Sequence, residues 1–247
     1  IAVFGIARKI GLCKKFIYCT GDWLANQSNK GLLSRLANNH LFVFMDYIAS
    51  TNCDLTESYS ERCNKAREIH WGRRLSKKLH SRYPPPIKIF PNTISPNRNN
   101  ICFLGQVRED SGFDLILPLL PKLNKDFGSK LKIIGPYSPE RADLEKKIKK
   151  LYLEDFVELH PFLPLDKLRE VMRDCFCGIN LITTFENYSS FAVPGKFIQY
   201  LQMQIPILTS KNNGAVDVVK KNKLGIVIEL STSLILSSIQ KLHQDQE

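Results

Sequence analysis

The stretch AVPGKFIQYLQMQIPIL, residues 192–208, combines a helix start with the apolar strand that follows it. Proline suits a first helical turn because it lacks an amide hydrogen that the turn would leave unpaired. Gly195 lets a ligand approach the backbone, and Lys196 adds a positive charge beside the positive end of the helix dipole. Pro194, Gly195 and Lys196 therefore predict a binding place for an anion. For this tripeptide taken alone, an ordinary helix start with an exposed lysine is the more frequent situation.

Short apolar runs alternate with helical patterns around this stretch. The runs are near-continuous rather than striped, which is typical of a parallel sheet covered by helices on both faces. The pattern predicts a doubly wound α/β domain over residues 100–247, whose ligands bind beyond the carboxyl ends of the strands. The six predicted strands are ICFLG (101–105), KLKIIG (130–135), FVELH (156–160), CGINLI (177–182), IPILTS (205–210) and LGIVIE (224–229).

Two neighbouring features support an anion site near Lys196. The small, polar loop TTFENYSS, residues 183–190, precedes the helix at the same edge of the predicted sheet and ends at Ser190. Gln199 follows Lys196 by three residues, on the same helical face. A phosphate held at Lys196 would therefore leave a sugar hydroxyl within reach of Gln199.

The first part of the chain predicts a separate unit. Its patterns favour strands at Ile1–Phe4 and Lys15–Cys19, helices over residues 30–49 and 61–80, and a closing strand at 87–91. The following PNTISPNRNN, with two prolines and four asparagines, breaks periodic structure. We therefore predict domains over 1–92 and 100–247, with a linker at 93–99. Because the chain begins without Met inside an apolar run, we also expect it to be incomplete at its N-terminus.

The net charge of +11 is concentrated in that first part. Residues 1–98 contain 16 Lys and Arg against 6 Asp and Glu, whereas the remaining residues are almost balanced. A basic field attracts nucleic acid, an anionic membrane or a phosphorylated substrate. No helix-turn-helix, RNA-recognition or zinc-finger pattern accompanies the charge, so we expect no specific nucleic-acid binding.

The cysteines and the hydropathy bear on the compartment. Seven scattered cysteines, several of them inside apolar runs, are typical of reduced core residues. Cys175 and Cys177 have no second Cys/His pair at the spacing of a zinc site, so no metal is expected. No long apolar run or signal-peptide pattern is present in the sequence. These features predict a cytoplasmic protein.

Two features of the first part suggest contacts with an acceptor or a membrane. Asp22 and Trp23 end a predicted strand at the crevice edge, where they would contact an acceptor; a turn with a buried tryptophan is an equal alternative. Trp71, Leu75 and Leu79 recur at helical spacing among basic residues. Such a helix would lie on an anionic membrane at its inner face, although an ordinary packed surface helix is more frequent.

The segment from ICFLG to LGIVIE resembles the donor-binding half of the group 1, or family 4, glycosyltransferases of the GT-B fold. Their pattern includes Pro-x-Lys-x-x-Glu-Tyr-Leu-x-x-Gly-x-Pro-Val and a late Gly-Ile/Leu-Val. FIYCTGDWL, FMDYIASTNCDLTESYSERCNKARE and IFPNTI extend a weaker resemblance to the acceptor domain. The corresponding residues are Gly105, Gly112, Gly135, Pro194, Lys196, Tyr200, Leu201, Pro206, Ile207 and Gly225.

The resemblance implies two Rossmann-like domains, the first only partly present, and sugar transfer from a nucleoside diphosphate sugar without a metal. It assigns Lys196 to the diphosphate, Gln199 to the ribose, and Gly195 and Gly105 to close backbone approach. Ser190 belongs to the same donor site. The acceptor, which a glycan or a lipid-linked sugar would fit, and the catalytic residues are not identified by it.

The chain also departs from the pattern. Gln106 and Ser111 replace an Arg and a Lys that engage the diphosphate, and Arg108 is the candidate substitute cation. The paired glutamates fall on Phe191 and Gln199, and Gln204 with Ile205 displaces the glycine before the last proline. The alternative to a glycosyltransferase of glycan biosynthesis is therefore an eroded homologue that acts as a binding or scaffold partner. A nucleic-acid binder ranks below both.

Overall fold

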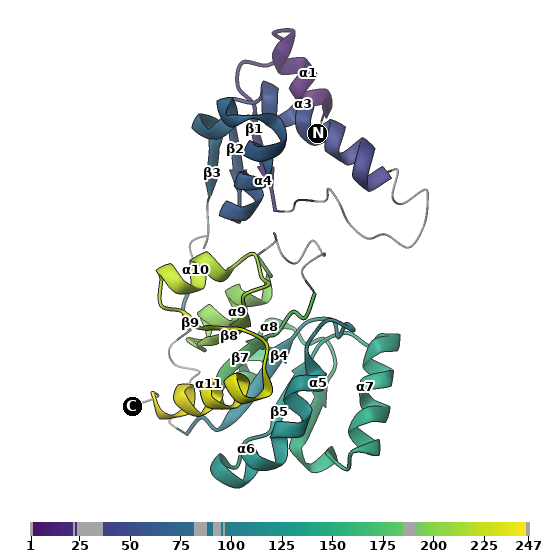
Figure 1. Ribbon diagram of the computed structural model, residues 1–247, viewed down its shortest axis with the longest axis vertical. Helices are drawn as coiled ribbons and strands as arrows, with labels where there is room; N and C mark the ends of the chain where they lie inside the picture. The colour runs from purple at the N-terminus through teal and green to yellow at the C-terminus, as the bar shows by residue number, and fades with distance from the viewer. Residues whose placement is uncertain are drawn as a thin grey trace. The chain divides into compact units, whose positions relative to one another are not determined.

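The computed structural model describes residues 2–21, 23, 37–81, 88–90, 95, 97–184, 191 and 193–245 (Figure 1). For residues 37–39 only the backbone is described. The chain divides into two compact units. One comprises residues 1–85, 184–194 and 212–217, and the other comprises residues 86–183, 195–211 and 218–247. The predicted linker at 93–99 falls partly outside the described residues and stays a prediction.

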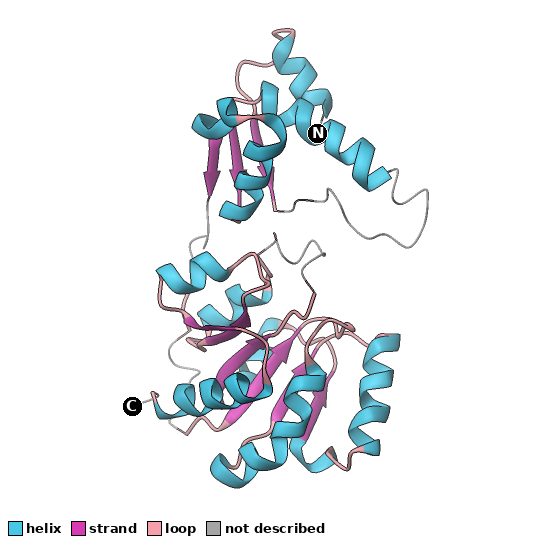
Figure 2. Ribbon diagram, viewed as in Figure 1, coloured by secondary structure: helices cyan, strands magenta, loops and turns pink. Residues whose placement is uncertain are grey.

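The first unit contains a three-stranded parallel sheet in the order β1-β2-β3. The strands are Ile17–Thr20, Leu55–Ser58 and Leu79–Ser81 (Figure 2). The helices are α1 (Ala2–Lys9), the π-helix η1 (Ala37–Phe42), α3 (Val43–Asn52), α4 (Glu61–Trp71) and the 3₁₀-helix η2 (Arg73–Lys78).

The strand predicted at Ile1–Phe4 is wrong, because helix α1 occupies this run. Helix α1 packs against α3, and Gly5 leaves no room for a side chain, since an added Cβ would lie 2.9 Å from the carbonyl oxygen of Ile48. A short apolar run is compatible with either a strand or a helix, and here the contact with α3 decides between them.

The helix predicted to carry Trp71, Leu75 and Leu79 on one face is also wrong. Helix α4 ends at Trp71 because Gly72 has a φ of 94°. Leu75 then lies in η2 with 3% of its surface exposed, and Leu79 begins β3. The apolar stripe is thus interrupted and packed inward. None of the helices that the structure describes has both the length and the apolar composition of a membrane span.

The second unit confirms the six predicted strands and their parallel direction. They form one sheet in the order β6-β5-β4-β7-β8-β9. Their bounds are β4 Asn100–Leu104, β5 Leu131–Ile134, β6 Val157–His160, β7 Cys175–Asn180, β8 Ile207–Ser210 and β9 Gly225–Ile228. The helical elements are α5 Phe113–Ile116, η4 Leu117–Leu119, α6 Leu120–Phe127, α7 Pro139–Lys150, η5 Glu154–Phe156, α8 Leu165–Met172, α9 Lys196–Gln202, α10 Val216–Lys221 and α11 Thr232–Gln244.

The central strands of this unit are buried on both faces. Every residue of β5 and of β7 is buried, and successive side chains of a strand point to opposite faces of the sheet. Ile101, Phe103, Leu131 and Ile133 belong to the main core cluster, and each is at most 2% exposed. Burial on both faces explains why these strands have no polar stripe, and it removes most of their apolar area from water, at roughly 25 cal/mol per Å².

Three helices end in the same hydrogen-bonded turn without a glycine. Tyr152 after α7, Gln204 after α9 and Lys223 after α10 have φ values of 54°, 52° and 52°. In each, the amide of this residue bonds three residues back and the next amide bonds five residues back, as in a Schellman motif. The left-handed conformation costs a residue with a Cβ about 1 kcal/mol, which glycine avoids. Gln204 occupies the position at which the family pattern has glycine.

Candidate functional site

The two halves of the second sheet diverge between β4 and β7. Strand order reverses at this point, which is the place where open α/β sheets bind ligands. The last paired residues are Cys102 and Gly178. Beyond them, the hydroxyl of Tyr200 from α9 accepts a hydrogen bond from the amide of Leu104 at 3.0 Å and lies 3.2 Å from the carbonyl oxygen of Ile179.

Gly178 is required for this insertion. A Cβ at this position would lie 2.7 Å from the ring of Tyr200, which is fully buried. The tyrosine therefore replaces the missing strand-to-strand hydrogen bond of Leu104 and holds α9 against the divergence of β4 and β7. This contact fixes the start of α9, and hence Lys196, at the carboxyl edge of the sheet.

The loop after β4 closes over the same edge. Gly105 and Gly112 have φ values of 107° and 71°, and a Cβ on Gly112 would lie 2.7 Å from the Cβ of Leu181. The carbonyl oxygen of Asp110 accepts a hydrogen bond from the amide of Thr183 at 3.0 Å. The loop 105–112 is thus attached to the segment that follows β7.

A second close approach involves the end of β5. A Cβ on Gly135 would lie 2.1 Å from the carbonyl oxygen of Gly105, so this position admits only glycine. The buried Arg141 of α7 donates through Nη1 to the carbonyl oxygens of Gly135 and His160, each at 2.7 Å. The carboxyl ends of three adjacent strands are therefore held in place by backbone contacts and one guanidinium.

The predicted Lys196 lies at the start of α9, one residue after the N-cap Gly195. Helix α9 begins two residues later than Pro194. The Nζ atom of Lys196 lies 4.1 Å from the ring centroid of Phe103, a cation–π contact. Removal from water, and then the charge of Arg108, lower the pKa of Lys196 to about 7, while Asp110 opposes the shift.

The ammonium of Lys196 has no carboxylate partner in the described part of the chain. The guanidinium of Arg108 is paired with Asp110, with Nη2 2.9 Å from Oδ2, and its own backbone amide donates to the hydroxyl of Ser111 at 3.0 Å. Lys196 and Arg108 therefore place two cationic groups against one carboxylate at this edge. This arrangement favours an incoming anion.

Gln199 lies one helical turn beyond Lys196 and is partly buried. Its Oε1 atom is removed from solvent and accepts no hydrogen bond from any described residue. A buried acceptor without a donor is unfavourable by about 1–3 kcal/mol. A ligand hydroxyl would remove this deficit.

The remaining predicted site residues are distributed as follows. Gly195 is exposed, with open space where a Cβ would be. Ser190 and Asp22 lie outside the described residues. Trp23 is 2% exposed and packs in the first unit against His70, Trp71 and the guanidinium of Arg67. Its predicted contact with an acceptor stays a prediction.

Sequence reasoning missed the contributions of Phe103 and Asp110. Phe103 was predicted only as a strand residue, but it lies next to the last residue of β4 and its ring contacts the ammonium of Lys196. The Arg-x-Asp spacing of Arg108 and Asp110 is the signal that would have indicated the ion pair. Across the described residues, no group of three or more His, Cys, Asp or Glu side chains is placed to hold a metal ion; metal independence stays a prediction.

The family model "Glycosyl transferases group 1" matches residues 86–247. The chain belongs to the group 1 glycosyltransferases. The matched residues include the whole second unit, with strands β4 and β7 and Lys196. A search of the curated proteins finds no match to this group 1 glycosyltransferase sequence.

Solved structures share the fold of this group 1 glycosyltransferase. Anabaena Alr3699/HepE in complex with UDP and glucose matches with a TM-score of 0.70 and 16% identity, over 98% of this chain and 65% of that one. Sucrose-phosphate synthase from Thermosynechococcus elongatus matches with a TM-score of 0.68 and 13% identity, over 99% and 62%. WaaG, a glycosyltransferase involved in lipopolysaccharide biosynthesis, matches with a TM-score of 0.64 and 14% identity, over 98% and 72%.

These likenesses confirm the GT-B-like fold with Rossmann-like units that the sequence predicted. The chain spans about two thirds of the length of Alr3699/HepE and somewhat less of the sucrose-phosphate synthase. At 13–16% identity they show the fold and not the substrate.

Proposed function

We propose that the chain transfers a sugar from a nucleoside diphosphate sugar to an acceptor, with the donor at the carboxyl edge of the second sheet. The observation that carries this proposal is the ammonium of Lys196, which is partly buried against the ring of Phe103 and has no carboxylate partner among the described residues. The family match supports the reaction class, and Alr3699/HepE, which binds UDP, makes uridine the first base to test.

The proposed chemistry is electrostatic. As the bond between the anomeric carbon and the diphosphate breaks, negative charge grows on the leaving phosphate. Lys196 in its protonated form would neutralise that charge in a site where water no longer screens it. Arg108 would add a second charge by turning from Asp110, and Gln199 would accept a hydrogen bond from a ribose hydroxyl.

Arg108 is suited to this change of partner because its ion pair is only partly buried. The side chain of Arg108 is 31% exposed, and an ion pair at this depth contributes little, of the order of 1 kcal/mol. A diphosphate with two charges competes effectively against a single carboxylate. Donor binding therefore does not require positively charged side chains at positions 106 and 111.

We further propose a glycan or lipid-linked sugar as the acceptor, used in the cytoplasm or at the inner face of its membrane. The support is the positive charge concentrated in residues 1–98, because an anionic surface or a phosphorylated carrier would be attracted to it. Vesicle co-sedimentation at low and high salt tests this part separately from the donor site.

A thermal-shift titration tests the donor site directly. UDP, GDP, ADP and their sugars are added to the wild type and to Lys196→Ala, with heparin as a polyanion control. A ligand that binds only the folded state raises the melting temperature by mass action. We expect one nucleotide to stabilise the wild type and to lose most of that effect in the variant. Stabilisation by heparin alone would contradict the proposal.

The second candidate is a binding or scaffold partner that has lost turnover. The pairing of Arg108 with Asp110 and the engagement of Ser111 within its own loop favour it, since neither residue is then directed to a donor. Release of UDP from UDP-glucose, measured with and without added glycan acceptors, separates the candidates. If the wild type turns over UDP-glucose and Lys196→Ala does not, the protein is not merely a scaffold partner.

A further inference from the structure

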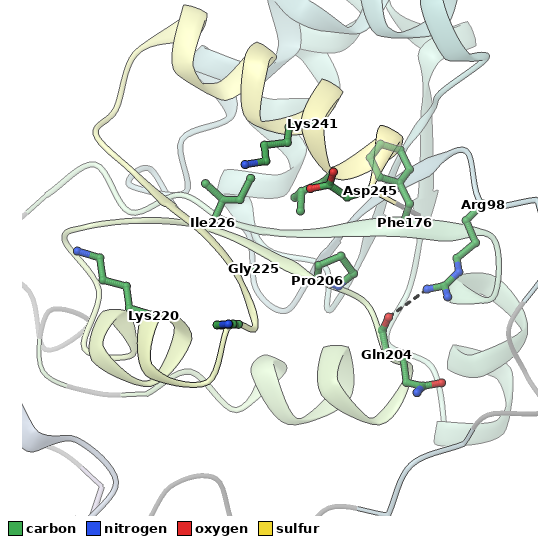
Figure 3. Close-up of a pocket in the computed structure, with 11 residues that line it drawn as sticks. Arg98, Phe176, Gln204, Pro206, Lys220, Gly225, Ile226, Lys241 and Asp245 are labelled. Carbon is green, nitrogen blue, oxygen red and sulfur yellow. Dashed lines mark hydrogen bonds between the residues drawn. The ribbon is translucent and has the colours of Figure 1, made fainter. Parts of the chain in front are cut away.

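A second concave site lies at the opposite edge of the same sheet. A pocket of about 730 Å³ is formed at the amino ends of β7, β8 and β9 (Figure 3). Its apolar lining comes from Phe176, Pro206, Ile226 and Leu242. The strands contain four to six residues at about 3.3 Å each, so roughly 13–20 Å separates this edge from Lys196.

The polar lining of this pocket is strongly basic. Arg98, Lys220, Lys223 and Lys241 line it together with a single carboxylate, Asp245. Figure 3 shows Arg98 on one side, Lys220 on the other and Lys241 between them on α11. Lys220, Lys223 and Lys241 have no side-chain hydrogen bond or ion pair with any described residue.

The ends of three helices reduce this positive charge without cancelling it. Lysines near a helix C-terminus often compensate the helix dipole, and Lys220 and Lys241 lie in the last turns of α10 and α11, while Gln204 marks the end of α9. Each dipole end is equivalent to about half a negative charge. Three such ends together with Asp245 therefore leave an excess of roughly 1.5 positive charges over the pocket. That excess is close to the charge of a phosphate monoester at neutral pH.

The backbone around the pocket is held in fixed turns. Gln204 and Lys223 are the left-handed residues that end α9 and α10. The guanidinium of Arg98 donates to the carbonyl oxygen of Gln204 at 3.0 Å, and partial burial lowers the pKa of Arg98. Two of the cations are thus attached to preorganised backbone, which reduces the entropy lost when a ligand binds.

We propose that this pocket binds a small phosphorylated molecule, with the phosphate among Lys223, Lys241 and Arg98 and a ring or other less polar part on Phe176 and Pro206. A volume of about 730 Å³ is within the range of small-molecule sites. The site is distinct from the donor site in position and in residues.

Isothermal titration calorimetry with glucose 6-phosphate, a ring that carries one phosphate monoester, tests the proposal. The test variant is the pair Lys223→Gln and Lys241→Gln, because Gln204 shows that glutamine adopts the left-handed turn in this chain. The matched control is the pair Lys149→Gln and Lys150→Gln, which removes the same charge from two exposed lysines at the end of α7. Lys196→Ala serves as the donor-site control.

We expect the test variant to weaken glucose 6-phosphate binding by about tenfold or more, from the loss of two charges near the phosphate. Binding to the α7 control and to Lys196→Ala should change less than about twofold. Equal weakening in the α7 control, loss of binding in Lys196→Ala, or no binding by the wild type would each overturn the proposal. Binding to phosphatidic acid vesicles without binding of the soluble sugar phosphate would overturn it as well.

Discussion

The guanidinium of Arg67 donates to both carboxylate oxygens of Asp46 in the interior of the first unit, where neither side chain has any exposed surface. Tyr18 and Trp71 donate to the same carboxylate at 2.9 and 3.1 Å. Asp46 thus joins β1, α3 and α4. Burial, and then the charge of Asp46, raise the pKa of Tyr18 well above its ordinary value.

Replacing Arg67 by Met should destabilise the protein by about 3–5 kcal/mol, because it leaves a buried carboxylate without its counter-ion. The free energy of unfolding from urea titration measures this loss. Adding Asp46→Leu should recover part of it, since the unpaired charge is then absent. The control Arg8→Met breaks an ion pair with Asp54 that is 34–39% exposed, and should lower the free energy of unfolding far less than Arg67→Met does. Equal losses in both single variants would contradict this account.

Tyr152→Gly should stabilise the protein by about 0.5–1 kcal/mol. Tyr152 is 87% exposed and left-handed, so the change relieves backbone strain with little loss of packing. Gly128→Ala is the reverse experiment, because Gly128 ends α6 with a φ of 69° and open space where the Cβ would be. It should destabilise by about 1 kcal/mol in the same urea assay. The prediction fails if the two changes have the same sign.

Tyr200→Phe should cost about 1–3 kcal/mol, since the buried amide of Leu104 loses its acceptor. The control is Tyr137→Phe, at a tyrosine that is 73% exposed, and it should be neutral. Hydrogen exchange at Leu104 gives a local measurement, and faster exchange is expected only in Tyr200→Phe. Unchanged exchange would mean that another group satisfies this amide.

The affinity for UDP-glucose should fall as the pH rises above 7. Lys196 has a pKa of about 7 in the free protein, and a bound diphosphate raises this pKa. At pH values between the pKa of the free protein and that of the complex, binding is therefore accompanied by uptake of a proton. The expected fall is at most about tenfold per pH unit. Lys196→Arg is the control, because arginine stays charged throughout and should give a flat profile. Parallel profiles for the two proteins would assign the dependence to another group.

Lys196 should also lower the stability of the ligand-free protein. Its pKa lies below the unfolded value near 10.4, so folding is penalised most below pH 7, and the penalty disappears as the pH rises towards that value. Lys196→Met should therefore melt at a higher temperature than the wild type at pH 6, and the difference should shrink at pH 9. A lower melting temperature at pH 6 would show that the charge is compensated.

The second unit was predictable because its signals are local and repeated. Six apolar runs separated by helical patterns specify a parallel sheet without any knowledge of tertiary contacts. Local signals also mark a helix start, since Ser138 caps α7 and Pro139 occupies its first turn. The first unit was predicted less well. Whether Ala2–Lys9 is a helix depends on its packing against α3, and the break at Gly72 depends on a backbone angle that the apolar spacing does not reveal.

The site was predictable in its position but not in its electrostatics. Lys196, Gln199 and Gly105 follow from a helix start and a strand end at one sheet edge. The pairing of Arg108 with Asp110, and the contact of Lys196 with Phe103, depend on how the loop 105–112 folds back onto the segment after β7. The basic pocket at the other edge was missed because its cations are spread over residues 98–241.

The contact of Tyr200 with Gly178 links two positions that are 22 residues apart in the sequence. The ring of Tyr200 leaves no room for a Cβ at position 178. A larger residue at position 178 is therefore compatible with the fold only if the residue at position 200 is smaller. Relatives that retain the tyrosine should therefore retain the glycine, and the two should change together where either is lost. The pair can thus serve as a sequence marker for chains in which the strands equivalent to β4 and β7 separate in this way.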